Sequence, residues 1–188
     1  MASTVNKIGI GRITGVNVNG MPWSYVGDIY DDKRHGKGIL TFDDGRCYEG
    51  DWQYDKKHGK GKFTWPSGEA YDGEYENDNM SGSGKYKYAN GNYYDGNFVN
   101  GKCSGKGKMT YANGEVYIGD WADNSWHGFG TWHIITSDAV KGKYVGNFEN
   151  GVRHGDGEIV FDEDCHVEGF IYQKGVPFKG KWLNDERV

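Results

Sequence analysis

The chain has 188 residues, including 32 glycines and 15% aromatic residues, and a net charge of -5 at pH 7. An acidic chain without a block of basic residues is not expected to bind nucleic acid, and evenly spread glycines with three prolines exclude a collagen-like or low-complexity chain. Because no apolar stretch is long enough for a signal peptide or a membrane-spanning helix, we expect a soluble intracellular protein.

Cysteine usage agrees with an intracellular location. Cys47, Cys103 and Cys165 cannot all pair within one chain, and they occupy different positions of the repeat described below. Free thiols in a reducing compartment are therefore the simplest expectation.

A 23-residue period organises the chain. The glycines of Tyr-x-Gly or equivalent sites are Gly27, Gly50, Gly73, Gly96, Gly119, Gly146 and Gly169, separated by 23 residues except for one step of 27. The first glycines of the Gly-x-Gly pairs, Gly36, Gly59, Gly82, Gly105, Gly128 and Gly155, keep the same spacing. Both series contain the longer step, so a four-residue insertion is predicted between Gly130 and Gly146.

Within each unit, alternation with period two predicts two β-strands. In the second unit Tyr48, Gly50 and Trp52 share one face, while Glu49 and Asp51 lie on the other. Positive-φ turn residues follow in the dipeptides Asp44-Gly45, Ser67-Gly68, Asn90-Gly91 and Asn113-Gly114. Glycines between the rings are expected to leave room for rings to lie flat across the sheet.

The predicted fold is all-β: an elongated single-layer antiparallel meander of tandem 23-residue hairpins. Residues 1–24 are expected to form a cap with a degenerate half-repeat, residues 25–172 an array of about six to seven units, and residues 173–188 a degenerate repeat or cap. The array is expected to carry its four-residue insertion near 131–145. One hairpin buries too little apolar area to fold alone, so stability is expected to be cooperative along the array.

The strings YEGDW and HGKGKFTWPSG, which recur in register, resemble the MORN (membrane occupation and recognition nexus) repeat family. The resemblance covers roughly residues 25–172, is clearest from Tyr25 to Trp132, and implies an open meander with a concave aromatic groove. Family members act as scaffolds, as cytoskeletal or membrane-linked adaptors, and as accessory modules of lipid kinases and lysine methyltransferases. Only 16 residues follow residue 172, so no catalytic activity is carried over, and the chain is predicted not to be an enzyme.

Side chains suited to metal or acid–base chemistry are explained by their repeat positions. His35, His58, His127 and His154 each precede a Gly-x-Gly, and equivalent positions about 10 Å apart cannot share one zinc ion. A metal at a sheet edge or subunit contact is the alternative to structural histidines. The recurring Asp28, Asp51, Glu74 and Asp120 are predicted to form a solvated face. No catalytic residue, metal or cofactor is predicted.

Three interaction surfaces remain as candidates. The first is an aromatic groove for a partner helix or extended peptide; its residues are Trp52, Tyr75, Tyr86, Tyr88, Phe98, Trp121 and Trp132. The second is the pair of sheet ends, where unpaired strand edges favour a homo-oligomer. The third is an anionic lipid contact through Lys56, Lys57, Lys60 and Lys62.

The function predicted from these surfaces is a protein–protein interaction scaffold or adaptor. The alternatives are a peripheral membrane adaptor on anionic phospholipid and an accessory subunit of a separate enzyme. The predicted location is the cytoplasm, including the cytoskeleton or a membrane surface.

Overall fold

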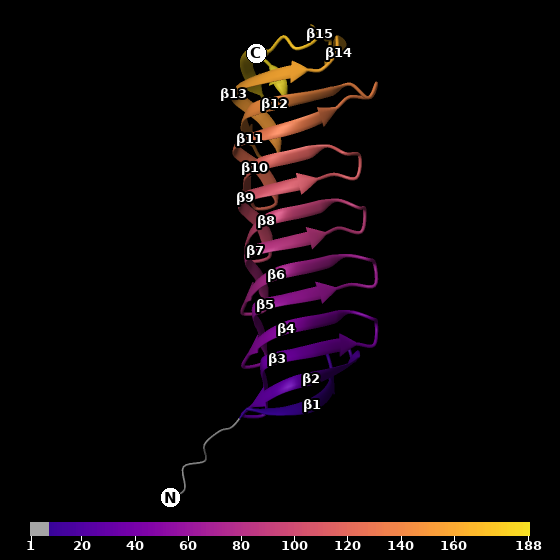
Figure 1. Cartoon of the computed structure of the whole chain (residues 1–188). Coiled ribbons are helices and arrows are strands. Elements are labelled where there is room, and N and C mark those ends of the chain that lie inside the picture. The colour runs from indigo at the N-terminus through magenta and orange to yellow at the C-terminus, as the bar shows by residue number, and fades with distance from the viewer. Residues whose placement is uncertain (1–7) are drawn as a thin grey trace, which may run out of the picture. The chain divides into compact units, whose positions relative to one another are not determined.

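The computed structural model describes residues 8–188, in which every regular element is a β-strand (Figure 1). These residues form two compact units, described separately below. The first contains the described residues up to Ala89 with Val99–Gly101, and the second contains Asn90–Phe98 with Lys102–Val188. The all-β antiparallel meander predicted from the sequence is confirmed.

In each unit, strands that follow one another in the chain pair antiparallel, except near the end of the second unit, where a separate hairpin interrupts the order. The first unit contains β1 (Gly9–Val16), β2 (Pro22–Tyr30), β3 (Lys33–Phe42), β4 (Cys47–Gln53), β5 (Lys56–Thr64), β6 (Ala70–Glu76) and β7 (Asn79–Lys87). The second contains β8 (Tyr93–Val99, except its last residue), β9 (Lys102–Thr110), β10 (Val116–Ala122), β11 (Ser125–Ile135), β12 (Lys141–Glu149), β13 (Val152–Phe161), β16 (Phe178–Leu183) and β17 (Glu186–Arg187). A separate hairpin is formed by β14 (Cys165–Val167) and β15 (Phe170–Tyr172).

A row of glycines crosses the strands of each unit in register. The row in the first unit is Gly11, Gly27, Gly38, Gly50, Gly61, Gly73 and Gly84, and that in the second includes Gly107, Gly119, Gly130, Gly146, Gly157 and Gly180. Tyrosine rings lie flat across these glycines: a Cβ atom at Gly61 would stand 2.3 Å from the hydroxyl oxygen of Tyr48. The expected use of glycine for close approach of rings is therefore confirmed.

The first glycine of each Gly-x-Gly pair has a different role, because it forms a β-bulge with positive φ. Gly36 and Gly59 have φ of 57° and 62°. An acidic side chain from the preceding strand bonds the backbone at each of these two bulges. The Asp51 carboxylate accepts a 2.9 Å hydrogen bond from the backbone N–H of Lys60. Asp28 makes the same bond to Lys37, at 2.9 Å. Asp28 and Asp51 are part-exposed, and beyond the predicted solvated face they also bond the backbone at the bulge of the next strand.

Aromatic rings on one side of the sheet, here called the ring face, pack edge to face in a continuous ladder. The first unit's ladder runs through Tyr25, Trp52, Tyr48, Tyr75 and Tyr71, with neighbouring ring centroids 5.0–5.4 Å apart. The second unit's ladder runs through Phe98, Tyr94, Trp121, Tyr117, Phe148, Tyr144 and Trp182, with neighbouring centroids 4.9–5.3 Å apart. Edge-to-face contacts are the preferred geometry of aromatic pairs. The ladder is therefore the hydrophobic core of each unit.

Six of the seven ladder tyrosines, all except Tyr75, also bond a backbone carbonyl at the bulge. The Tyr25 hydroxyl donates to the carbonyl oxygen of Asp28 at 2.7 Å, and the Tyr48 hydroxyl to that of Asp51 at 2.9 Å. Tyr71, Tyr94, Tyr117 and Tyr144 repeat this bond three residues ahead of themselves. One side chain thus packs the core and completes the hydrogen bonding of the bend.

The buried tyrosines predict loss of stability in alkali. Burial, aided by nearby Asp28, raises the pKa of Tyr25 to about 12, and burial raises the pKa of Tyr144 to about 12. Since an unfolded tyrosine ionises near pH 10, this stabilisation is complete below that pH and is lost as the pH rises through 12. Thermal melts followed by circular dichroism should give a melting temperature that is constant from pH 7 to 9 and falls steeply above about pH 10.

The matched variant for this prediction is Tyr25→Phe, which keeps the ring and removes the ionisable hydroxyl. Its melting temperature should fall less between pH 9 and 11 than that of the wild type. Identical pH profiles would show that Tyr25 does not contribute to the alkaline transition.

Tight turns between paired strands contain a second recurring hydrogen bond, from a turn side chain to the preceding repeat, that the sequence did not predict. Tyr54 and Asp55 both have positive φ, and the Asp55 carboxylate accepts a 2.9 Å hydrogen bond from the backbone N–H of Arg34, one repeat earlier. Asp78 binds the N–H of Lys57 in the same way, and Asn124 that of Cys103. The turn of one repeat is thereby fastened to the preceding one.

The four-residue insertion lengthens two strands rather than their connecting loop. β11 and β12 have 11 and 9 residues, whereas the equivalent β9 and β10 have 9 and 7. The loop between β11 and β12 closes with a 2.9 Å backbone bond from Thr136 to Val140, as the equivalent loop does from Tyr111 to Glu115. The added residues lie in the two strands between Gly128 and Phe148.

The last repeat differs from its prediction. The 23-residue spacing predicts that Gly169 lies in the next strand of the array, but it lies between β14 and β15 of the separate hairpin. β13 pairs instead with β16, where Gly157 faces Gly180 and the Trp182 ring contacts Tyr144 at 4.9 Å. Residues 173–188 therefore hold a genuine half-repeat, and the part of the predicted 1–24 cap before Ile8 lies outside the described residues.

Candidate interaction surfaces

Four of the seven rings predicted to line an open groove are enclosed. Trp52, Tyr75, Phe98 and Trp121 have exposed fractions of only 3–5% because they form the edge-to-face ladder. Tyr86, Tyr88 and Trp132 are half-buried. The expectation of an open aromatic surface is therefore corrected: most of its rings are core.

The four lysines predicted to contact lipid do not form one surface. Lys57 turns onto the ring face, where its Nζ lies 5.0 Å from the centroid of the Phe63 ring and 5.1 Å from that of Tyr75. Burial there lowers the pKa of Lys57. Lys60 and Lys62 project from the same strand away from the ring face, and Lys56 lies exposed at the start of β5.

Shallow hollows lie on the face opposite the rings, here called the hollow face of each unit. In the first unit a hollow of about 720 Å³ is lined by glycines of the row and by side chains of alternating charge. Glu49 faces Lys62, which faces Asp72 on the next strand. These opposite charges lie side by side, so Lys62 has a carboxylate opposite it on each neighbouring strand.

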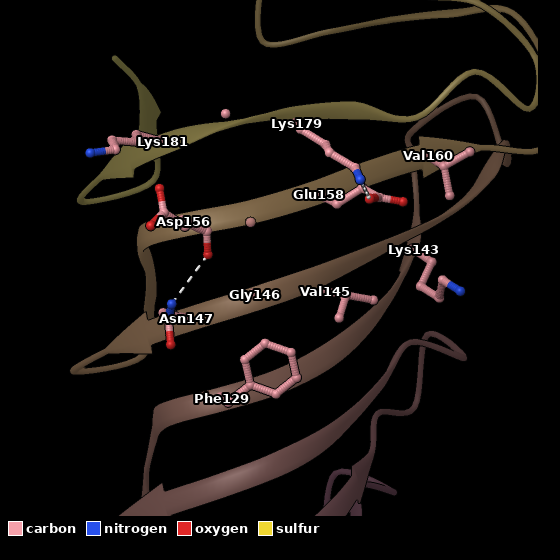
Figure 2. Close-up of a pocket in the computed structure, with 12 residues that line it drawn as sticks. Phe129, Lys143, Val145, Gly146, Asn147, Asp156, Glu158, Val160, Lys179 and Lys181 are labelled. Atoms are coloured by element: carbon pink, nitrogen blue, oxygen red, sulfur yellow. Dashed lines mark hydrogen bonds and ion pairs between the residues drawn. The ribbon is translucent and has the colours of Figure 1, made fainter.

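Two hollows of the second unit share Lys143 and Val160 as lining residues. Figure 2 shows the first, of about 720 Å³, where Phe129, Val145 and Val160 project from three neighbouring strands over the glycine row. The second, of about 750 Å³, is lined by Lys108, Val116, Ile118, His133, Lys141 and Asp162 among others. Together we call them the lysine–apolar hollow.

This surface combines exposed apolar groups with lysines. Phe129 is 57% exposed and Ile118 47%. Lys179 forms an ion pair with Glu158 at 3.3 Å, and Figure 2 shows Lys181 pointing away from the centre. The remaining lining lysines, Lys108, Lys141 and Lys143, form no ion pair with any residue in 8–188.

The remaining candidate residues occupy structural positions. The His35 ring lies between those of Tyr30 and Tyr54, at centroid distances of 5.5 and 4.9 Å. Over residues 8–188 no three His, Cys, Asp or Glu side chains gather as metal ligands. Cys47, Cys103 and Cys165 form no disulfide. The same part of the chain contains no helix able to cross a membrane.

Arg153 is an enclosed cation that the sequence reading also missed. Its side chain is 3% exposed and binds Asp185 at 3.0 Å and Glu168 at 2.6 Å. Asp185 lies in the turn of the last half-repeat, between β16 and β17. Glu168 lies in the turn of the separate β14–β15 hairpin. Arg153 bonds Asp185 as Arg34 bonds Asp55 in the first unit. Arg153 therefore holds the β14–β15 hairpin and the final turn against β13.

Tandem hairpins, bulge glycines in register and a tyrosine-centred ladder define a β-repeat protein. A family model for the MORN repeat matches residues 25–45, 48–70, 71–93, 94–116, 117–135 and 144–163. The chain therefore belongs to the MORN-repeat family. A search of curated proteins gave no match.

Proposed function

We propose that this chain is a non-enzymatic interaction module that binds a partner protein on the hollow face of its second unit. MORN repeats are generally associated with protein and membrane interactions. The observation that carries the proposal is the pair of exposed side chains Phe129 and Ile118 beside lysines without ion pairs. Exposed apolar patches rimmed by polar groups are typical of interaction sites.

The sheet ends remain a second part of this proposal. β1 pairs only with β2 among residues 8–188, and Ile10 on this strand is 86% exposed. An edge strand of this kind offers backbone groups for pairing with a second copy or a peptide.

Crosslinked capture from the native cell tests the proposal. Phe129→Glu combined with Ile118→Glu should abolish recovery of the partner, since both changes place charge on the proposed contact. Val26→Glu with Ile39→Glu is the matched control, because these exposed side chains lie on the hollow face of the first unit. Equal partner recovery from wild type and the Phe129/Ile118 variant would refute the proposed surface.

The anionic-lipid alternative is tested in parallel by vesicle sedimentation at physiological salt. Lys56, Lys60 and Lys62 are the residues to change to Glu, whereas Lys57 is left intact because it packs among rings. Sedimentation that depends on these three lysines, without a captured protein, would favour the lipid function over the proposed one.

A further inference from the structure

We infer that the lysine–apolar hollow takes a peptide segment in which acidic side chains flank a large apolar side chain. This inference rests on the proposed function and specifies the chemistry of the partner. It is drawn from three properties of the second unit: which groups are exposed, which charges lack partners, and how the strands place them.

The apolar part of the hollow is built across neighbouring strands. Val145 lies opposite Thr131 on β11 and Glu158 on β13, while Phe129 lies opposite Asn147 on β12. Among the aromatic rings that line the hollows, Phe129 is the most exposed. Val145 and Val160, which line the same hollow, are half-buried. An apolar side chain of a partner placed here would remove water from both itself and Phe129.

The charged part favours an anionic partner. Five lysines but only three carboxylates, Asp156, Glu158 and Asp162, line the two hollows. In the hollow of about 750 Å³, three lysines are accompanied by a single carboxylate, Asp162. A smaller adjoining hollow, which also includes Ile118 and Lys108, adds Asp95 and Lys106, and Lys106 is paired with Asp120. A locally positive surface on a chain of net charge -5 would attract acidic segments and repel basic ones.

Strand register brings lysines and apolar groups together. Lys108 lies directly opposite Ile118, and Lys143 lies between His133 and Val160. A peptide that places its apolar side chain against Ile118 or Val160 would therefore bring adjacent carboxylates near Lys108 or Lys143. The first unit lacks this arrangement, because Glu49 and Asp72 flank Lys62 on its hollow face.

The test is a display selection from a random library of peptides about 12 residues long, with the purified full chain as bait. Enriched peptides should combine Asp or Glu with Leu, Phe or another large apolar residue. The same selection on a Lys108→Glu, Lys143→Glu variant should lose that enrichment. The matched control, Lys60→Glu with Lys62→Glu in the first unit, should retain it.

Fluorescence anisotropy then measures the best peptide against the same proteins. We expect at least about a tenfold loss of affinity for the Lys108/Lys143 variant and for Phe129→Ser, and weaker binding as salt rises. Enrichment without acidic bias, or equal affinity for the Lys108/Lys143 variant, would overturn the inference. So would a failure to enrich any peptide.

Two outcomes separate this inference from the function on which it rests. If the Phe129/Ile118 variant loses its captured partner but no acidic peptide is enriched, the surface stands and the inferred chemistry falls. If an acidic peptide binds while capture is unaffected by that variant, the hollow binds peptides but is not the contact for the cellular partner. Sedimentation of phosphatidylserine vesicles abolished by Lys108→Glu with Lys143→Glu, with no enriched peptide, would assign the lysines to lipid and overturn the inference.

Discussion

Replacing Gly50 with alanine is expected to lower the free energy of unfolding by about 2–4 kcal/mol. A Cβ atom at this position would lie 2.5 Å from the Cα of Gly61 and 2.6 Å from the carbonyl oxygen of Lys60. Both are backbone atoms of the paired strand. The strands would therefore have to separate where Tyr48 and its ring neighbours are most tightly packed.

Urea unfolding followed by tryptophan fluorescence measures this effect. Gly9→Ala on β1 is the matched control, since a Cβ there would meet no atom within 4 Å. The control should change stability by less than about 0.5 kcal/mol. A Gly50→Ala variant as stable as Gly9→Ala would show that the glycine row is not required for close approach. Because φ of Gly50 is not positive, backbone strain is not an alternative cause.

Residues that repeat at one position were predictable because their packing role is the same in every unit. Tyr48, Gly50 and Trp52 recur every 23 residues, so period-two alternation placed them on one face, and the structure agrees. The spacing rule failed after Gly157. Gly169 has the right spacing but no ring two residues before it, whereas Phe178 and Trp182 flank Gly180 as Tyr48 and Trp52 flank Gly50.

Polar roles were less predictable, because a carboxylate at an alternating strand position looks the same whether it is hydrated or bonded. Asp51 completes a bulge and Asp55 fastens the preceding repeat, through bonds to Lys60 and Arg34. A partial signal was present in the sequence. An Asp or Asn recurs in the turn ahead of each Gly-x-Gly, at Asp55, Asp78 and Asn124, and turns with positive φ favour these residues.

The candidate surface was misplaced for a related reason. Large rings mark apolar area, but the sequence does not say whether that area is buried by neighbouring rings or open to a partner. Trp52 and Trp121 are enclosed by tyrosines of the same and the preceding repeat, while Phe129, a single ring at a position that is otherwise Lys, Ser or Asp, stays exposed. The departure from the repeat pattern, rather than the pattern, located the candidate site.

Trp121→Ala is expected to lower the free energy of unfolding by about 3–5 kcal/mol. The Trp121 ring is 5% exposed and packs edge to face on Tyr94 and Tyr117, at centroid distances of 5.1 and 5.3 Å. Its indole N–H also donates to the carbonyl of Gly107 at 3.2 Å. Removing the ring leaves a cavity in a one-layer core, which no second layer of structure fills.

Chemical unfolding of Trp121→Ala, followed by far-ultraviolet circular dichroism, should show a strongly lowered midpoint. Phe129→Ala, which removes an exposed ring from the opposite face, should stay within about 1 kcal/mol of wild type. Similar losses for the two variants would contradict the division into a packed ring face and an open hollow face. This division decides which variants can be used to study binding. If Trp121→Ala no longer binds a partner, the cause is unfolding. If Phe129→Ala no longer binds a partner while its stability is unchanged, Phe129 is part of the contact.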